Sequence, residues 1–237
     1  QPFPEYTKEL SREEAMKFFR ALDALAEKEG FDPNIGPAMM RDTDDPAQAE
    51  LLAEVLSATK LNSSIIIAAD DGIHWNAVRA AAKLVKYVSE HSPHSQGTFG
   101  FAATAMLAPY APFYPGAYHT GAGKQFAVAL EAANVVDEAF TGTRGNAQAA
   151  TQRLTQALGT HAAAIEKLAR AAEKETAWTY MGMDPTPAPL KDISIGAAIE
   201  KFTGVRFGSS GTLLAASIIT AAVKAAPVKH VGYSGLM

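Results

Sequence analysis

Residues 98–119 read TFGFAATAMLAPYAPFYPGAYH, in which an apolar segment runs directly into a proline-rich loop. Positions 99–106 are apolar almost throughout and predict a buried strand. The loop has prolines at 109, 112 and 115, which fix φ and remove backbone donors, so we expect it to be stiff. It also carries aromatic and imidazole side chains: Tyr110, Phe113, Tyr114, Tyr118 and His119. Such a loop is equally suited to form one wall of a small-molecule pocket and to plug the mouth of a barrel.

Around this stretch, short apolar segments alternate with amphipathic ones. Strands are predicted at 34–39, 62–69, 99–106, 124–130, 178–183 and 229–233. Helices are predicted at 11–30, 44–57, 75–89, 131–140, 146–174, 194–202 and 209–225. The alternation predicts one α/β domain with a mainly parallel sheet or barrel covered by helices. The runs 63–69, 99–105 and 178–183 are expected to be parallel neighbours or near-neighbours in one buried sheet, because they are unbroken and apolar.

A site is expected at the carboxyl edge of this sheet. Parallel strands connected with one handedness leave the sheet at the same edge, where ligands collect. Four unusual loops are expected to share that edge: 70–75, 109–119, 184–194 and 232–235. Tyr233 and Ser234 enter the candidate site through the last of them.

Composition excludes several functions. The formal net charge is −4 with no basic stripe, so nucleic acid is not an expected partner. No apolar run reaches the ~20 residues of a membrane-spanning helix, so no membrane partner is expected. The chain has no cysteine, which excludes disulfides, cysteine nucleophiles and thiyl radicals within it. No haem, flavin or nucleotide motif is present, and a cytoplasmic location is the default expectation.

Asp184 is the first acid–base candidate. It ends a predicted strand, and the run DPTPAP at 184–189 follows at once. A carboxylate held there has little freedom, which suits a general base or a hard-metal ligand. The alternative is an aspartate that accepts hydrogen bonds from its own turn. His119 is the second candidate, because imidazole titrates near neutrality; a structural histidine bonded to loop carbonyls is the alternative.

An anion-binding role is expected for helix starts rich in hydroxyl groups. Ser194 precedes one helix, and a second begins with Ser209, Ser210, Gly211 and Thr212. Free backbone N–H groups at such a start bind carboxylate or phosphate, although plain helix capping explains the same residues. Lys124 could add a positive charge. Trp75, Phe113, Tyr114 and Tyr118 are expected to wall the pocket.

A divalent metal is a further possibility. Asp70, Asp71 and His74 lie within five residues at a strand end and could supply oxygen and nitrogen ligands. Short acidic turns that cap helices are the commoner explanation of such a pattern.

Four separated motifs resemble one family. They are PFYPGAYH at 112–119, GMDPTPAP at 182–189, Phe207-Gly208 with Gly211-Thr212-Leu213, and GYSGLM at 232–237. Together they resemble the uncharacterised family called domain of unknown function seven hundred and eleven, often labelled pyruvate formate-lyase family proteins. The resemblance implies a barrel similar to that of the glycyl-radical enzymes, in proteins longer at both ends. It does not imply radical chemistry, because those enzymes use cysteines.

Three functions are therefore open. The first is polar acid–base catalysis on a small anionic metabolite, with Asp184 and His119 transferring protons. The second is a non-catalytic metabolite-binding or scaffold protein that uses the same cleft. The third is a divalent-metal hydrolase or lyase built on Asp70, Asp71, His119 and Asp184. We also expect a homo-oligomer, because 48% of the residues are hydrophobic and the net charge is low. We expect the chain to be part of a longer barrel protein.

Overall fold

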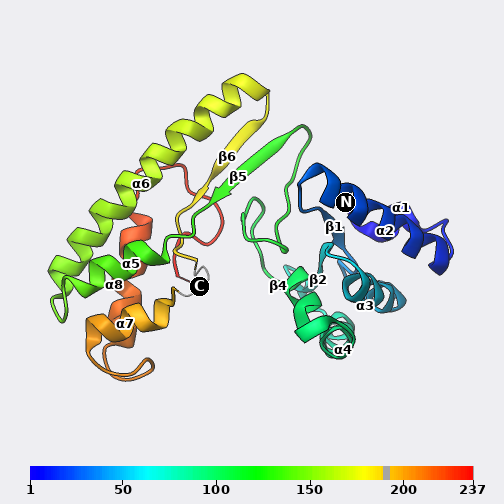
Figure 1. The fold of residues 1–237 in the computed structure, drawn as a ribbon, viewed down its shortest axis with the longest axis horizontal. Helices are drawn as coiled ribbons and strands as arrows, with labels where there is room; N and C mark the ends of the chain where they lie inside the picture. The colour runs from blue at the N-terminus through cyan, green and yellow to red at the C-terminus, as the bar shows by residue number, and fades with distance from the viewer. Residues whose placement is uncertain (189–192, 237) are drawn as a thin grey trace. The chain divides into compact units, whose positions relative to one another are not determined.

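A computed structural model describes residues 1–188 and 193–236 (Figure 1). The chain divides into two compact units. The N-terminal unit comprises Gln1–Leu107 and Tyr114–Ala117, and the C-terminal unit comprises Ala108–Phe113 and Tyr118–Met237. Both units mix helices with parallel strands, which confirms the predicted α/β class. The division falls within the proline-rich loop, which contributes to both units.

The N-terminal unit contains the predicted elements in the predicted order, together with a first short helix, a two-residue strand and a 3-10 helix that were not predicted. Its elements are α1 (Phe3–Thr7), α2 (Arg12–Glu29), β1 (Asn34–Pro37), α3 (Ala47–Ala58), β2 (Asn62–Ala69), β3 (Gly72–Ile73), α4 (Trp75–His91), the 3-10 helix η1 (Pro93–Gly100) and β4 (Phe101–Ala105). Strands β1 and β4 each pair in parallel with β2, and β3 turns back antiparallel onto its end. The predicted parallel pairing of the strand at 63–69 with the one near 99–105 is confirmed.

One strand begins later than predicted. The apolar run suggested 99–106, whereas residues 93–100 form η1 and Phe99 is 88% exposed. Pro93 removes a backbone donor, and His94 and Ser95 both have positive φ, so the chain bends before it can join the sheet.

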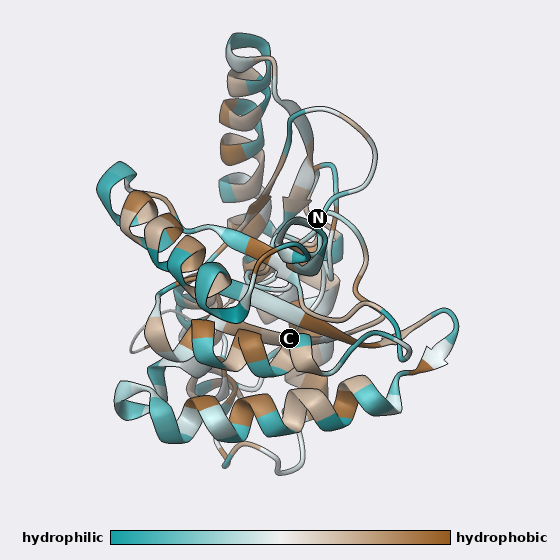
Figure 2. Ribbon diagram, turned by 90° about the vertical axis from the view of Figure 1, so that its right-hand side faces the viewer, coloured by the Kyte–Doolittle hydropathy of each residue, from teal (hydrophilic) through white to brown (hydrophobic). Residues whose placement is uncertain are grey.

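Local capping and a separate core stabilise the N-terminal unit. Helix α2 begins with a capping box, in which the backbone N–H of Ser11 donates to Glu14 at 2.8 Å, and ends at Gly30 with a φ of 74°. The helices bury an apolar face on the sheet, with a core that includes Phe19, Leu52 and Val88. Figure 2 shows the corresponding alternation of hydrophobic and hydrophilic residues along the helices.

The C-terminal unit is built around two parallel strands. Its elements are β5 (Gln125–Ala129), α5 (Ala133–Thr141), α6 (Ala147–Thr176), β6 (Thr179–Asp184), α7 (Ile195–Thr203) and α8 (Thr212–Lys224). Gln125 pairs with Thr179 at one end of the ladder, and Ala129 pairs with Asp184 at the other. The strand predicted at 178–183 thus exists, but its partner is β5 and not β2 or β4.

The predicted final strand is reduced to a short parallel contact beside β6. The backbone N–H of Met183 donates to the Lys229 carbonyl at 2.8 Å, and that of Val231 donates to the Met183 carbonyl at 3.1 Å. The bridge pairs Met183 with His230. This contact brings residues 230–235 to the carboxyl end of β6.

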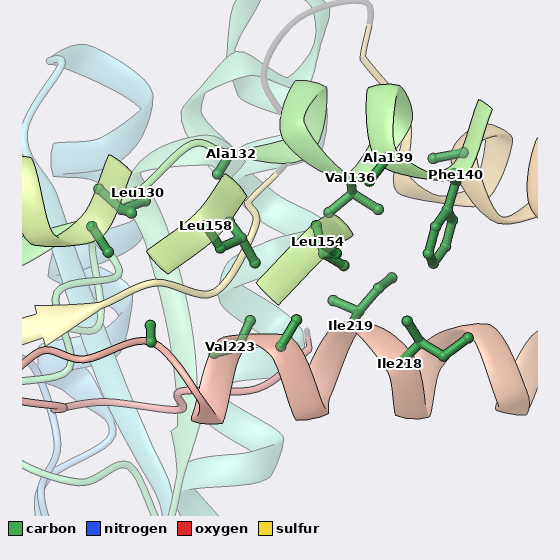
Figure 3. Close-up of a cluster of buried hydrophobic side chains, with 14 of the residues drawn as sticks. Leu130, Ala132, Val136, Ala139, Phe140, Leu154, Leu158, Ile218, Ile219 and Val223 are labelled. Atoms are coloured by element: carbon green, nitrogen blue, oxygen red, sulfur yellow. The ribbon is translucent and has the colours of Figure 1, made fainter. Parts of the chain in front are cut away.

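Helices α5, α6 and α8 enclose the core of the C-terminal unit. Figure 3 shows Val136 and Phe140 of α5 facing Leu154 of α6 and Ile219 of α8. Helices α5 and α7 run in the same direction, since Phe140 stacks near Phe202 and Asp137 pairs with Lys201 at 2.7 Å. Both helices therefore start at the carboxyl edge of the β5–β6 sheet.

Among the residues described here, no helix is long and apolar enough to cross a membrane.

Candidate functional site

Asp184 ends β6 and is completely buried. Its Oδ2 accepts a hydrogen bond from the backbone N–H of Tyr233 at 2.6 Å. Its Oδ1 accepts from the backbone N–H groups of Thr186 at 2.9 Å and Ser234 at 3.1 Å. Three backbone donors thus take the place of water around a buried carboxylate. This arrangement includes the turn-capping contact that is the alternative to a catalytic role, and it makes Asp184 an anchor for residues 233–234.

The turn at 232–235 is held in place by a second buried side chain. Thr186 Oγ1 accepts from the backbone N–H of Gly235 at 3.0 Å. Gly232 has a φ of 68°, and a Cβ there would collide with Asp184 Oδ2. Glycine is therefore required at 232 by both conformation and space. Asp184 and Thr186 together hold the backbone of residues 233–235 in place.

His230 and Ser234 form a polar pair on this turn. His230 Nδ1 lies 3.0 Å from Ser234 Oγ, and His230 Nε2 lies 2.9 Å from the Ala226 carbonyl oxygen. Because a carbonyl only accepts, Nε2 must carry a hydrogen, and Nδ1 of the neutral ring is then an acceptor. The Ser234 hydroxyl also lies 3.0 Å from the Val231 carbonyl oxygen, so it has two possible acceptors.

This pair can take up a proton without losing hydrogen bonds. When His230 is neutral, the Ser234 hydroxyl donates to Nδ1; when the ring is protonated, Nδ1–H donates to the hydroxyl, which then donates to Val231. Ser234 was among the predicted site residues, whereas His230 was not. The sequence feature that could have indicated this pair is the four-residue spacing of His230 and Ser234, with Gly232 between them.

Aromatic side chains and helix starts border the pair. Tyr233 is 52% exposed, and its ring centroid lies 5.6 Å from that of Phe113. Helices α5 and α7 start at the same edge of the sheet, and Ser194 caps α7 by accepting from the backbone N–H of Ala197 at 3.2 Å. Of the predicted site residues, four lie at this edge of the sheet: Phe113, Ser194, Tyr233 and Ser234.

Lys124 lies at the opposite end of the sheet. It immediately precedes β5, where the backbone N–H of Thr179 donates to its carbonyl at 2.9 Å. Its ammonium group lies 5.9 Å from the centroid of the Trp178 ring, which is a cation–π distance. The expectation that Lys124 and Asp184 line one pocket is therefore wrong, because strand pairing places them at opposite ends of the β5–β6 sheet.

The start of α8 also lies away from Asp184. The backbone N–H of Phe207 donates to Glu200 near the end of α7, and Thr212 Oγ1 accepts from the backbone N–H of Gly208 at 3.0 Å. A Cβ on Gly211 would lie 3.2 Å from Thr203, so the start of α8, with Ser209, Ser210, Gly211 and Thr212, lies beside the end of α7. These contacts do not support the expectation of one cleft containing Asp184 and this helix start.

The proline-rich loop holds His119 at the surface. The Tyr110 hydroxyl donates to the Thr120 carbonyl at 2.7 Å, and the Tyr110 backbone N–H donates to the Tyr118 carbonyl at 2.8 Å. His119 lies between these two contacts and is exposed. Its proposed acid–base role therefore stays a prediction that no contact in the described part of the chain supports.

Two of the predicted aromatic walls belong to the N-terminal unit. The Tyr114 hydroxyl donates to the Asp32 carbonyl at 2.6 Å, and burial raises the pKa of Tyr114 to about 12. Trp75 is 57% exposed at the first position of α4. Tyr114 thus ties the proline-rich loop to the chain before β1, which gives this side chain a structural role.

The predicted metal residues form a different kind of contact. His74 is 3% exposed, with Nδ1 3.0 Å from the Ile66 carbonyl oxygen and Nε2 2.9 Å from Asp71 Oδ1. Both ring nitrogens face acceptors, which favours the protonated imidazolium. The hydrogen bond with Asp71 raises the pKa of His74, and the same bond lowers the pKa of Asp71.

This pairing leaves His74 without a nitrogen lone pair for a metal. Across residues 1–188 and 193–236, no group of three or more His, Asp or Glu side chains is arranged to hold an ion. A metal site at Asp70 and Asp71 thus stays a hypothesis, because no third ligand is found beside them in the described part of the chain.

The N-terminal unit has a cavity that the sequence analysis did not anticipate. It measures about 440 Å³ and lies between α2, α3 and α4. Its lining residues are Arg12, Pro46, Ala49, Glu50, Ala53, Glu54, Asn76, Arg79, Ala80, Lys83, Leu84 and Tyr87. A volume of this size is within the range of ligand-binding clefts.

Comparison with known proteins identifies a family. The family described as Uncharacterised ACR (DUF711) matches residues 1–237. A UPF0210 protein of Pyrobaculum islandicum is 32% identical over 227 residues, which cover 90% of this chain and 49% of that protein. A UPF0210 protein of Pyrobaculum arsenaticum is 30% identical over 189 residues, covering 75% and 40%. The chain therefore spans about half the length of the curated relatives that it matches.

Proposed function

The chain belongs to the Uncharacterised ACR (DUF711) family, and we propose that it binds a small anionic metabolite at the carboxyl edge of the β5–β6 sheet. We further propose that His230 transfers a proton there, in polar chemistry without a radical. Asp184 acts as a positioning residue for the turn that carries Ser234. His119 is kept as a second proton-transfer candidate.

The hydrogen-bonded pair of His230 and Ser234 carries this proposal. Its bonds at 3.0 and 2.9 Å fix the tautomer and let the ring gain or release a proton at Nδ1. A general acid or base needs such a poised nitrogen within reach of the substrate. Ser234 is only partly buried, so a ligand can approach its hydroxyl.

The preference for an anion rests on the two helix starts at the same edge. Helices α5 and α7 both present their positive dipole ends there, and α5 lacks a side-chain cap. Developing negative charge on a substrate would be stabilised in the same way. Tyr233 and Phe113 offer an aromatic surface for the body of the ligand.

We expect at least one member of a panel of small carboxylates and phosphorylated metabolites to raise the melting temperature of the protein. With that ligand as substrate, His230→Gln should lower kcat by about a hundredfold or more, because proton transfer contributes at least this much. Glutamine can still bond to Ser234, so the melting temperature should change little. His161→Gln is the matched control, because His161 is exposed on the surface of α6. Full activity of His230→Gln would refute the role.

A non-catalytic binding protein is the second candidate. It is favoured by the environment of Asp184, which is completely buried and accepts three backbone hydrogen bonds, as expected of a structural carboxylate. In that case ligand binding would persist in His230→Gln and no turnover would be found in either protein. The metal-dependent hydrolase and the barrel similar to glycyl-radical enzymes stay hypotheses about the complete protein, as does a cytoplasmic location.

We also propose self-association. Phe99 and Leu213 are 88% and 85% exposed, and large exposed apolar side chains commonly lie in interfaces. Light scattering should therefore report a mass above the 25.0 kDa of one chain at micromolar concentration. Phe99→Ser combined with Leu213→Ser should reduce that mass. A monomer mass for the unsubstituted chain would contradict the proposal.

A further inference from the structure

A trough runs between α3 and α4 of the N-terminal unit and is bordered by Arg12 of α2. It is the cavity of about 440 Å³ described above. On α4 its lining extends from Asn76 to Tyr87, which is about 16 Å of helix. The trough is therefore long enough for about three turns of a helix lying along it.

The floor of the trough is made of small apolar side chains. Ala49 and Ala53 lie one turn apart on α3, and Ala80 and Leu84 lie one turn apart on α4. All four are buried. Alanine in such positions lets the backbone of a third helix come close, as small residues do at helix–helix contacts.

The two walls carry opposite charges at helical spacing. Glu50 and Glu54 stand on α3, and Arg79 and Lys83 stand on α4, each pair four residues apart. Arg12 of α2 also lines the trough and donates to both carboxylate oxygens of Glu54, at 3.0 and 2.8 Å. Within the described residues, no salt bridge engages Glu50, Arg79 or Lys83. Arg79 reaches only Asn76, at 3.4 Å.

We propose that this trough binds an amphipathic α-helix of a partner protein. The helix has a narrow apolar face, a basic flank that lies over Glu50 and Glu54, and an acidic flank that lies over Arg79 and Lys83. Charged groups four residues apart along both walls match charges one turn apart on a helix. An apolar helix face in a hydrophobic groove is a recurring mode of recognition, and the charges select the partner.

The test uses two synthetic alanine-rich peptides of equal composition. In the segregated peptide, lysines occupy one flank and glutamates the other; in the mixed peptide, each flank carries one of each. Binding to the full chain is measured by fluorescence anisotropy at low salt. We expect the segregated peptide to bind about tenfold more tightly, because weak surface charge pairs are gained at Glu50, Arg79 and Lys83, whereas Glu54 is already paired with Arg12. A peptide with the two charged flanks exchanged is not a valid control, because it can bind in the same way after turning end to end in the trough. The mixed peptide cannot, so it serves as the control.

Exchanging one charge on each wall provides the decisive variant. Glu50→Lys with Arg79→Glu leaves the net charge unchanged but makes both walls mixed, so the preference should invert in favour of the mixed peptide. Glu50→Lys with Lys83→Glu serves the same purpose if the first variant does not fold. Failure of both peptides to bind at about 1 mM, equal affinities, or an uninverted preference overturns the proposal. Loss of self-association in the variant without peptide binding would assign the trough to a second copy and also overturn it.

Discussion

Asp184→Ala is expected to lower the free energy of unfolding of the C-terminal unit by about 3–5 kcal/mol. The substitution leaves three backbone N–H groups without their acceptor, and each buried unpaired donor costs about 1–3 kcal/mol. Asp184→Asn should cost less, since the amide oxygen can still accept from Thr186 and Ser234 while its NH2 faces the Tyr233 N–H. For this reason Asp184→Asn is a poor probe of catalysis alone.

The two tryptophans make this loss measurable for one unit at a time. Trp75 is in the N-terminal unit and Trp178 in the C-terminal unit. In a Trp75→Phe background, urea unfolding followed by Trp178 fluorescence reports the C-terminal unit. Asp137→Ala, which removes a half-exposed salt bridge with Lys201, is the control and should cost less than about 1 kcal/mol. An Asp184→Ala midpoint equal to that of the control would contradict the anchoring role.

His74→Ala is expected to destabilise the N-terminal unit by about 2 kcal/mol at pH 6 and by less at pH 9. It removes a buried side chain and both of its hydrogen bonds. The pKa of His74 is raised in the folded state by Asp71, and also by the Ile66 carbonyl and Asp42. Its contribution is therefore complete below the unfolded pKa of about 6.5 and is lost as the pH rises through the raised folded value.

Protonation of Asp71 sets the lower pH limit of its interaction with His74. Its pKa is lowered by His74, so its contribution is present above the unfolded value near 4 and is lost as the pH falls through the lowered folded value. Unfolding in a Trp178→Phe background, followed by Trp75 fluorescence, should show stability decreasing above neutral pH. His74→Gln should flatten that decrease. His94→Asn is the control, since asparagine tolerates the positive φ of position 94. An unchanged pH profile in His74→Gln would show that another group titrates.

Local features of the fold were predictable from the sequence. The continuous β-branched run at 62–69 is strand β2, and Ser11 and Gly30 bound α2 as expected. These features depend on residues within a few positions of one another, where periodicity and capping chemistry act directly. The beginning of β4 was misplaced because the left-handed turn at His94 and Ser95 has no apolar signature.

The candidate site was predictable only in part. The hydrogen bond from the Thr186 N–H to Asp184 joins residues two positions apart, and the sequence left it open as the alternative to a catalytic role. The bonds from Tyr233 and Ser234 to Asp184 join positions 49 and 50 residues apart, which the sequence did not reveal. The four-residue spacing of His230 and Ser234 did not by itself place the pair, and only the contact of His230 with Met183 brought it beside β6. Lys124 was predicted as a positive charge and the α8 start as a hydroxyl-rich anion site. Lys124 lies at the opposite end of the β5–β6 sheet, and the α8 start lies beside the end of α7.

By itself, the sequence determined the α/β class, the order of most strands and helices, the family motifs and the exclusion of cysteine chemistry. These follow from composition and from periodicities within single elements. Only the tertiary structure decided which strand pairs with β6, that the buried Asp184 carboxylate accepts three backbone hydrogen bonds, and that oppositely charged side chains flank an apolar floor between α3 and α4. The physical reason is that hydrogen bonds and charge pairs act over a few ångströms in space, whatever the separation of the residues along the chain.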